Sequence, residues 1–78
     1  KRRQWSVSKE EAERRVESLT LRERQIVELV LKDLSNQEIA EALKLSRRTI
    51  ECHRQVAYKK LQVNNVKELK LILEEGKQ

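Results

Sequence analysis

A helix-start signal that occurs four times in 78 residues constrains this sequence most. In each case a capping side chain is followed three residues later by glutamate, and the capping residues are Ser8, Thr20, Ser35 and Asn65. In such a capping box the first side chain accepts a hydrogen bond from the glutamate amide, and the carboxylate reaches back to the capping residue. Proline is absent and Gly76 is the one glycine, so the turn residues that a β fold needs are missing. The pattern predicts an all-α fold.

Apolar residues recur at helical spacing behind the caps, and no segment alternates with period two. We expect a helix over 9–18, a second behind Thr20, a short helix over 36–43, a longer helix over 47–62 capped by Ser46, and a last helix that ends near Glu75. This arrangement predicts a four-helix domain without a wing, preceded by an N-terminal linker helix.

The expected first helix carries only Ala12 and Val16 on its apolar side, a stripe too narrow to hold a helix alone. It is therefore either frayed or packed on a neighbour, and Trp5 and Val7 are candidate anchors. We divide the chain into a linker region, 1–18, and a domain, 19–78.

The net charge of +5 is unevenly distributed. Residues 44–62 contain six basic side chains and one acidic side chain, Glu51, so this segment alone carries +5. Such a segment is the electrostatic footprint of a protein that binds a polyanion, although a solvated helix face has the same composition. Apolar runs of at most three residues exclude a membrane span. The single cysteine, Cys52, cannot form an internal disulfide. Because disulfides are rare in the cytoplasm, this favours a cytoplasmic location for the protein.

Lys44, Leu45 and Ser46 join the short helix to the longer one. A turn of this length makes two helices cross steeply, as in a helix–turn–helix unit. At 100° per residue, one side of the longer helix holds the residues expected to face the core, which are Ile50, His53, Ala57 and Leu61. The opposite side holds Arg48, Glu51, Cys52, Gln55 and Lys59.

The outward side can read bases in a major groove. Gln55 suits an adenine edge, Glu51 can accept from a cytosine amino group, and Arg48 can reach guanine. Other side chains flank this side and are candidates for phosphate contacts, namely Arg47, Arg54 and Lys60. The amide end of the short helix, with Ser35 and Asn36, is a further anion site, unless its role is capping alone.

Four separated motifs occur in order: Leu19-Thr20-x-Arg22-Glu23-Arg24, Leu34-Ser35-Asn36-x-Glu38-Ile39-Ala40, Leu45-Ser46-x-x-Thr49-Ile50-x-x-His53 and Lys60-Leu61-x-Val63. Over residues 19–75 they resemble the LuxR-type (GerE-like) helix–turn–helix domain. The charged helix before them resembles those of FixJ/NarL-type response regulators.

The resemblance implies a bacterial transcription regulator whose third domain helix enters the major groove of double-stranded DNA. It implies base contacts at Glu51, Cys52 and Gln55, to which we add Arg48. It also implies phosphate contacts at Thr49 and nearby basic residues, so the full phosphate set is Ser35, Asn36, Arg47, Thr49, Arg54, Lys59 and Lys60.

In this family the last helix commonly forms a two-fold dimer on DNA. Leu71 points away from the other leucines of that helix, beside Lys67 and Glu74, so these three residues are the expected dimer interface. A regulatory domain outside this chain is an expected partner, and RNA polymerase is a further candidate.

Several positions depart from the family pattern. Glycine is usual where this chain has Asp33, Lys44 and Gln62, and proline is frequent at Leu21. Glu51 stands where a basic residue is common, so the operator sequence does not transfer from relatives.

The same residues support other functions less well. No paired carboxylates, nucleophile–base set or phosphate loop is present, so we predict that the chain is not an enzyme and has no cofactor. His53 is expected to be a hydrogen-bonded core residue rather than a metal ligand, and a redox role for Cys52 stays open. The alternatives are region four of a sigma factor, which would bind polymerase as a monomer, and a protein-interaction module on the same scaffold.

Overall fold

The computed structural model describes residues 7–76 as five helices with no strand among them. They are α1 (Lys9–Glu17), α2 (Leu21–Leu31), α3 (Asn36–Leu43), α4 (Arg47–Leu61) and α5 (Val66–Gly76). The predicted all-α class is confirmed, and each boundary lies within two residues of the expected one. Trp5, a predicted anchor, lies outside the described residues. Val7, the other, is half-buried and packs against the core.

Local hydrogen bonds start the helices where the caps predict. Both halves of the capping box form at Thr20 and at Ser35. The box at Ser8 is only half formed, because the Glu11 carboxylate accepts from Arg14 and Arg15 instead of reaching back.

The last cap also differs from the expected box. Asn65 Oδ1 accepts from the Glu68 amide at 2.9 Å as predicted. The Glu68 carboxylate, however, accepts from the amide of Asn64 at 2.8 Å, one residue earlier than expected. The helix still begins at Val66, since either bond satisfies an amide at the helix entrance.

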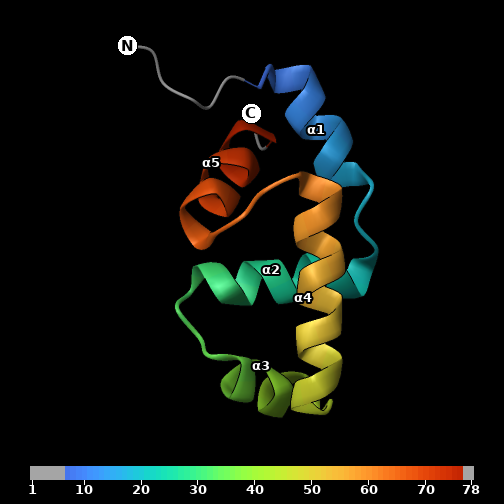
Figure 1. Cartoon of the computed structure of the whole chain (residues 1–78), viewed down its shortest axis with the longest axis vertical. Helices are drawn as coiled ribbons and strands as arrows, with labels where there is room; N and C mark the ends of the chain where they lie inside the picture. Colours follow the sequence, from blue (N-terminus) through green and yellow to red (C-terminus); the bar gives the residue numbers. More distant parts are fainter. Residues whose placement is uncertain (1–6, 77–78) are drawn as a thin grey trace.

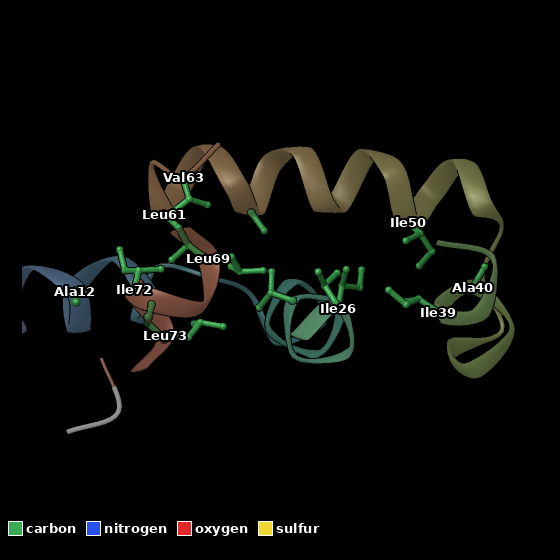
Figure 2. Packing of buried hydrophobic residues seen from close by; sticks show 14 residues of the cluster. Ala12, Ile26, Ile39, Ala40, Ile50, Leu61, Val63, Leu69, Ile72 and Leu73 are labelled. Atoms are coloured by element: carbon green, nitrogen blue, oxygen red, sulfur yellow. The ribbon is translucent and has the colours of Figure 1, made fainter. Parts of the chain in front are cut away.

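Helix α4 is the longest element and runs along one side of the hydrophobic core. Figure 2 shows Ile50 beside Ile39 and Ala40 at one end of the core, and Leu61 beside Leu69 and Ile72 at the other. Ile50 and Leu61 are fully buried, so α4 joins two halves of one core. In Figure 1, α3 lies at the first end of α4, whereas α1 and α5 lie at the other.

Helix α1 is packed, not frayed. Ala12 is fully buried and Val16 is 6% exposed, and α1 packs mainly on α5. Arg15 Nη1 also donates to the Leu61 carbonyl at 3.3 Å. The first helix therefore belongs to the same core as the other four, while the division of the chain after residue 18 stays a prediction.

Three helices end on a residue with left-handed backbone. Asp33, Lys44 and Gln62 have φ of 67°, 59° and 59°, the conformation for which the usual glycines are suited. The amide after each of them donates to the carbonyl five residues earlier, as in a Schellman motif. The donors are Leu34, Leu45 and Val63, and all three side chains pack on the core. These residues stop the helices although none of the three positive-φ positions is glycine.

Candidate nucleic-acid interface

Helices α3 and α4 form a helix–turn–helix unit whose turn lies at one end of the molecule (Figure 1). Lys44 turns the chain with its positive φ, and Leu45 lies half-buried against the core. Ser46 Oγ then accepts from the Thr49 amide at 3.1 Å and contacts the Thr49 hydroxyl at 2.8 Å. The turn thus fixes the start of α4 and orients Thr49, a predicted phosphate contact.

The two sides of α4 have opposite environments. Ile50, Ala57 and Leu61 are fully buried, as expected. All five residues predicted to face outward are exposed, and they are Arg48, Glu51, Cys52, Gln55 and Lys59. His53 departs from its expected place, because it is half-buried and its imidazole makes no hydrogen bond within residues 7–76.

Arg47 and Glu51 pair on this exposed side. Arg47 Nε lies 3.2 Å from Glu51 Oε2, and the two side chains are 64% and 48% exposed. A pair so exposed contributes at most about 1 kcal/mol to stability. Its consequence is local, since the Arg47 guanidinium offsets the negative charge of Glu51.

Arg54 connects α4 to the start of α3. Its Nη1 donates to Asn36 Oδ1 at 2.7 Å, and its Nη2 donates to the Tyr58 hydroxyl at 3.2 Å. The guanidinium carbon also lies 5.4 Å from the centroid of the Tyr58 ring. Two predicted phosphate residues, Asn36 and Arg54, are therefore brought together, and three of the five guanidinium N–H groups are left for another acceptor.

Tyr58 is a residue of this site that sequence reasoning missed. Its spacing of four from Arg54 on a helix places the two side chains side by side, and this spacing is the signal that could have identified it. The contact of Arg54 with Asn36, 18 residues earlier, has no such local signal.

The start of α3 is occupied by its own cap. Ser35 Oγ accepts from the Glu38 amide at 3.1 Å, and the Ser35 amide donates to the Glu38 carboxylate at 2.8 Å. In a capping box the amides of the first two helical residues, here Asn36 and Gln37, keep no partner inside the helix. An anion at this end would be held by those amides, by Arg54 and by the Ser35 hydroxyl, which accepts from Glu38 and keeps its own O–H to donate.

Lys60 lies apart from the other predicted phosphate residues. Its ammonium is 2.8 Å from the carboxylate of Glu23, which is 5% exposed, and 3.3 Å from the Ser18 carbonyl. Burial raises the pKa of Glu23, but hydrogen bonds from Lys60 and from the Thr20 amide outweigh burial and hold this pKa below its ordinary value. Lys60 thus compensates a buried charge near the end of α4, whereas neighbouring Lys59 is exposed.

The predicted dimer residues lie on α5, at the opposite end of α4 from α3 (Figure 1). Leu71 is 37% exposed although Leu69, Ile72 and Leu73 of the same helix are buried. Lys67 and Glu74 are exposed as well. A surface of this kind is accessible to a second copy of the chain.

Two further results concern the described part of the chain. No helix in it is long and apolar enough to cross a membrane. Residues 7–76 hold no cluster of three or more His, Cys, Asp or Glu side chains that could bind a metal ion.

The family model of "Bacterial regulatory proteins, luxR family" matches residues 17–73, which include all of α2, α3 and α4. The chain is 42% identical over 53 residues to the tetrathionate response regulatory protein TtrR of Salmonella typhimurium, covering 68% of this chain and 26% of TtrR. It is 46% identical over 55 residues to the transcriptional regulatory protein FixJ of Bradyrhizobium diazoefficiens, covering 70% and 27%.

Among solved structures, full-length FixJ from B. japonicum superposes with a TM-score of 0.78 at 36% identity. The match covers 88% of this chain and 34% of FixJ. The chain therefore spans about a quarter to a third of the length of these proteins.

Proposed function

We propose that this chain, which belongs to the luxR family of bacterial regulatory proteins, binds double-stranded DNA by placing α4 in the major groove. The family is one of helix–turn–helix DNA-binding transcription regulators and is not a family of enzymes. The observation that carries the groove assignment is the contrast between the sides of α4. Ile50, Ala57 and Leu61 are fully buried, while the hydrogen-bonding side chains opposite them are free to meet base edges.

Base reading is assigned to the exposed side chains of α4, namely Arg48, Glu51, Cys52 and Gln55. Gln55 can make paired hydrogen bonds to adenine, and Arg48 can do so with guanine. Glu51 can accept from cytosine, because Arg47 offsets its charge. Each good bidentate contact discriminates by about 1–3 kcal/mol against a wrong base.

Phosphate binding is assigned to residues on both sides of this row, which are Ser35, Asn36, Arg47, Thr49, Arg54, Lys59 and Lys60. Arg54 is the strongest of them, because Asn36 and Tyr58 already hold its guanidinium. Lys60 is the weakest, because its ammonium is bound to Glu23. Contacts of this kind set the position of the protein on DNA and carry no sequence information of their own.

Dimerisation is assigned to α5 through Lys67, Leu71 and Glu74, with the two copies held one helical turn apart on DNA. A patch centred on one exposed leucine supplies little association energy, so the free domain is expected to be a monomer that pairs on its operator.

Control by a regulatory domain outside residues 1–78 stays a prediction, as does contact with RNA polymerase. Binding to bacterial DNA would take place in the cytoplasm.

Selection of bound sequences from a random DNA library, followed by a salt titration on the selected site, tests this proposal. A protein that contacts about six phosphates should lose affinity with a log–log slope of roughly −5, and the selected sites should contain a two-fold repeat. An asymmetric site bound together with RNA polymerase would support the sigma-factor alternative. The absence of DNA binding at low salt would contradict the proposal and support a protein-interaction module.

A further inference from the structure

Val56 is an exposed apolar side chain on a helix whose exposed side is otherwise polar. Four large apolar side chains are exposed in the part of the chain that the structure describes: Leu21, Val56, Val66 and Leu71. Of these four, Val56 alone lies on α4, and it is 43% exposed. A single exposed apolar side chain is common on a protein surface, so what distinguishes Val56 is its place on α4.

The position of Val56 connects it to the base-reading row. Val56 follows Cys52 by four residues, so the two side chains lie one above the other on the helix, and both are exposed. Val56, Gln55 and Lys59 line a hollow in the surface. The other flank of α4 carries charged and hydrogen-bonded groups, which are Arg47, Glu51, Arg54 and Tyr58. Val56 therefore stands beside Cys52 and Gln55, with the polar side chains of Thr49 and Lys60 next to it on its own flank.

We infer that Val56 reads the C5-methyl group of a thymine beside the base pair that Gln55 contacts. This inference rests on the proposed function, since it requires α4 to lie in the major groove. On base edges in that groove the thymine methyl is the apolar group, and every other distinguishing group is a hydrogen-bond donor or acceptor. An exposed valine can make neither kind of hydrogen bond, so the methyl is the feature that it can recognise.

Replacing thymidine by deoxyuridine, one position at a time, in the selected duplex tests the inference. Uracil lacks only the methyl group and keeps the hydrogen-bonding edge of thymine. One position per half-site should weaken binding of the unaltered protein about three- to fivefold, the effect of burying one methyl group. In Val56→Ala the same replacement should have no effect, while the slope of the salt titration should stay unchanged.

Two variants separate Val56 from its neighbours. Leu21→Ala removes another exposed apolar side chain, 77% exposed and located on α2, and should leave every uracil effect in place. Cys52→Ala identifies any methyl that Cys52 contacts, since that position should differ from the one assigned to Val56. If Val56→Ala fails to fold, Val56→Ser also removes both γ-methyl groups and should abolish the uracil effect at the same position.

The outcomes distinguish this inference from the proposed function. Steep, salt-dependent DNA binding with the same uracil effects in Val56→Ala and the unaltered protein would overturn the role of Val56 and leave DNA binding intact. A loss of all salt-dependent DNA binding in the unaltered protein would overturn both.

Discussion

Glu23 is a buried charged side chain in the first turn of α2, and Lys60 compensates for its charge. The carboxylate of Glu23 is 5% exposed and accepts hydrogen bonds from the Lys60 ammonium at 2.8 Å and from the Thr20 amide at 3.0 Å. A buried charge that loses its partner is strongly unfavourable. Lys60 therefore stabilises the fold by neutralising Glu23 of α2. This role is independent of any contact that Lys60 makes with DNA.

Replacing Lys60 tests this role. Lys60→Met keeps the aliphatic stem but leaves the Glu23 carboxylate without its cation, so the free energy of unfolding at pH 7 should fall by about 1–3 kcal/mol. Lys59→Met is the matched control, and because Lys59 is exposed its effect should stay within about 0.5 kcal/mol. Urea denaturation measures both, and equal effects of the two variants would contradict the assignment.

The same pair predicts a pH dependence. The folded-state pKa of Glu23 lies below the ordinary value of 4.5, so its contribution is complete above pH 4.5 and is lost as the pH falls through the folded pKa. In Lys60→Met the hydrogen bond and the positive charge of Lys60 no longer lower the pKa of Glu23, so this pKa should rise. The stability difference between the two proteins should therefore shrink below pH 4.5. A constant difference between pH 7 and pH 3 would show that Glu23 is not responsible.

Helices α2, α3 and α4 are each followed by a residue with positive φ, and none of these three residues is glycine. A left-handed backbone costs a residue with a β-carbon roughly 1–2 kcal/mol, and Lys44 and Gln62 occupy that region with φ of 59° each. The Schellman hydrogen bonds, and the contacts that the next residues make with the core, hold these ends in place despite the cost. These ends are positions where the domain can be stabilised.

Lys44→Gly and Gln62→Gly should each raise the free energy of unfolding, by up to about 1 kcal/mol, because glycine adopts positive φ without a steric cost. Thermal denaturation measures the change. Glu41→Gly is the control within α3, where φ is helical, and it should instead destabilise by about 1 kcal/mol. Destabilisation by all three glycines would show that the positive-φ positions are not strained.

The helix starts and the exposed side of α4 could be predicted because both depend on residues close together in the sequence. Ser35 and Glu38 form their box within one turn, and Gln55 is exposed because its helix has a fixed period. Contacts between distant segments could not be predicted in this way. The placement of Lys60 on Glu23, 37 residues away, depends on how α2 and α4 cross.

In the whole molecule, the proposed DNA-binding surface around the start of α4 and the proposed dimer surface on α5 lie far apart. The turn between α3 and α4 lies at one end, and α1 and α5 lie at the other (Figure 1), along the longest dimension of 40 Å. A second copy on α5 can therefore be present without covering α3. This separation predicts that dimerisation and half-site binding respond to different substitutions.

Leu71→Glu should weaken cooperative binding to paired half-sites by roughly tenfold, the equivalent of about 1.4 kcal/mol, and leave affinity for a single half-site nearly unchanged. Gln25→Glu makes the same change of charge at an exposed residue of α2 and should affect neither. Gel-shift titrations on one and two half-sites measure the difference. An equal loss on both substrates would mean that Leu71 does not act at a dimer interface.

Removing residues 1–18 tests whether the first helix is a separable linker. Because Ala12 and Val16 are buried and α1 packs on α5, the chain 19–78 should lose at least about 2 kcal/mol of stability. Denaturation of the two chains measures this loss. Equal stability would confirm a boundary at residue 18 and contradict the shared core.

If the exposed side of α4 lies against a DNA duplex, nuclear magnetic resonance of the labelled domain will detect the contact residue by residue. On addition of the selected half-site, the amide signals of Arg48, Cys52 and Gln55 should shift strongly, while that of Leu71 on α5 should change little. Unmoved signals at those three residues, with the helices intact and DNA in excess, would contradict the account.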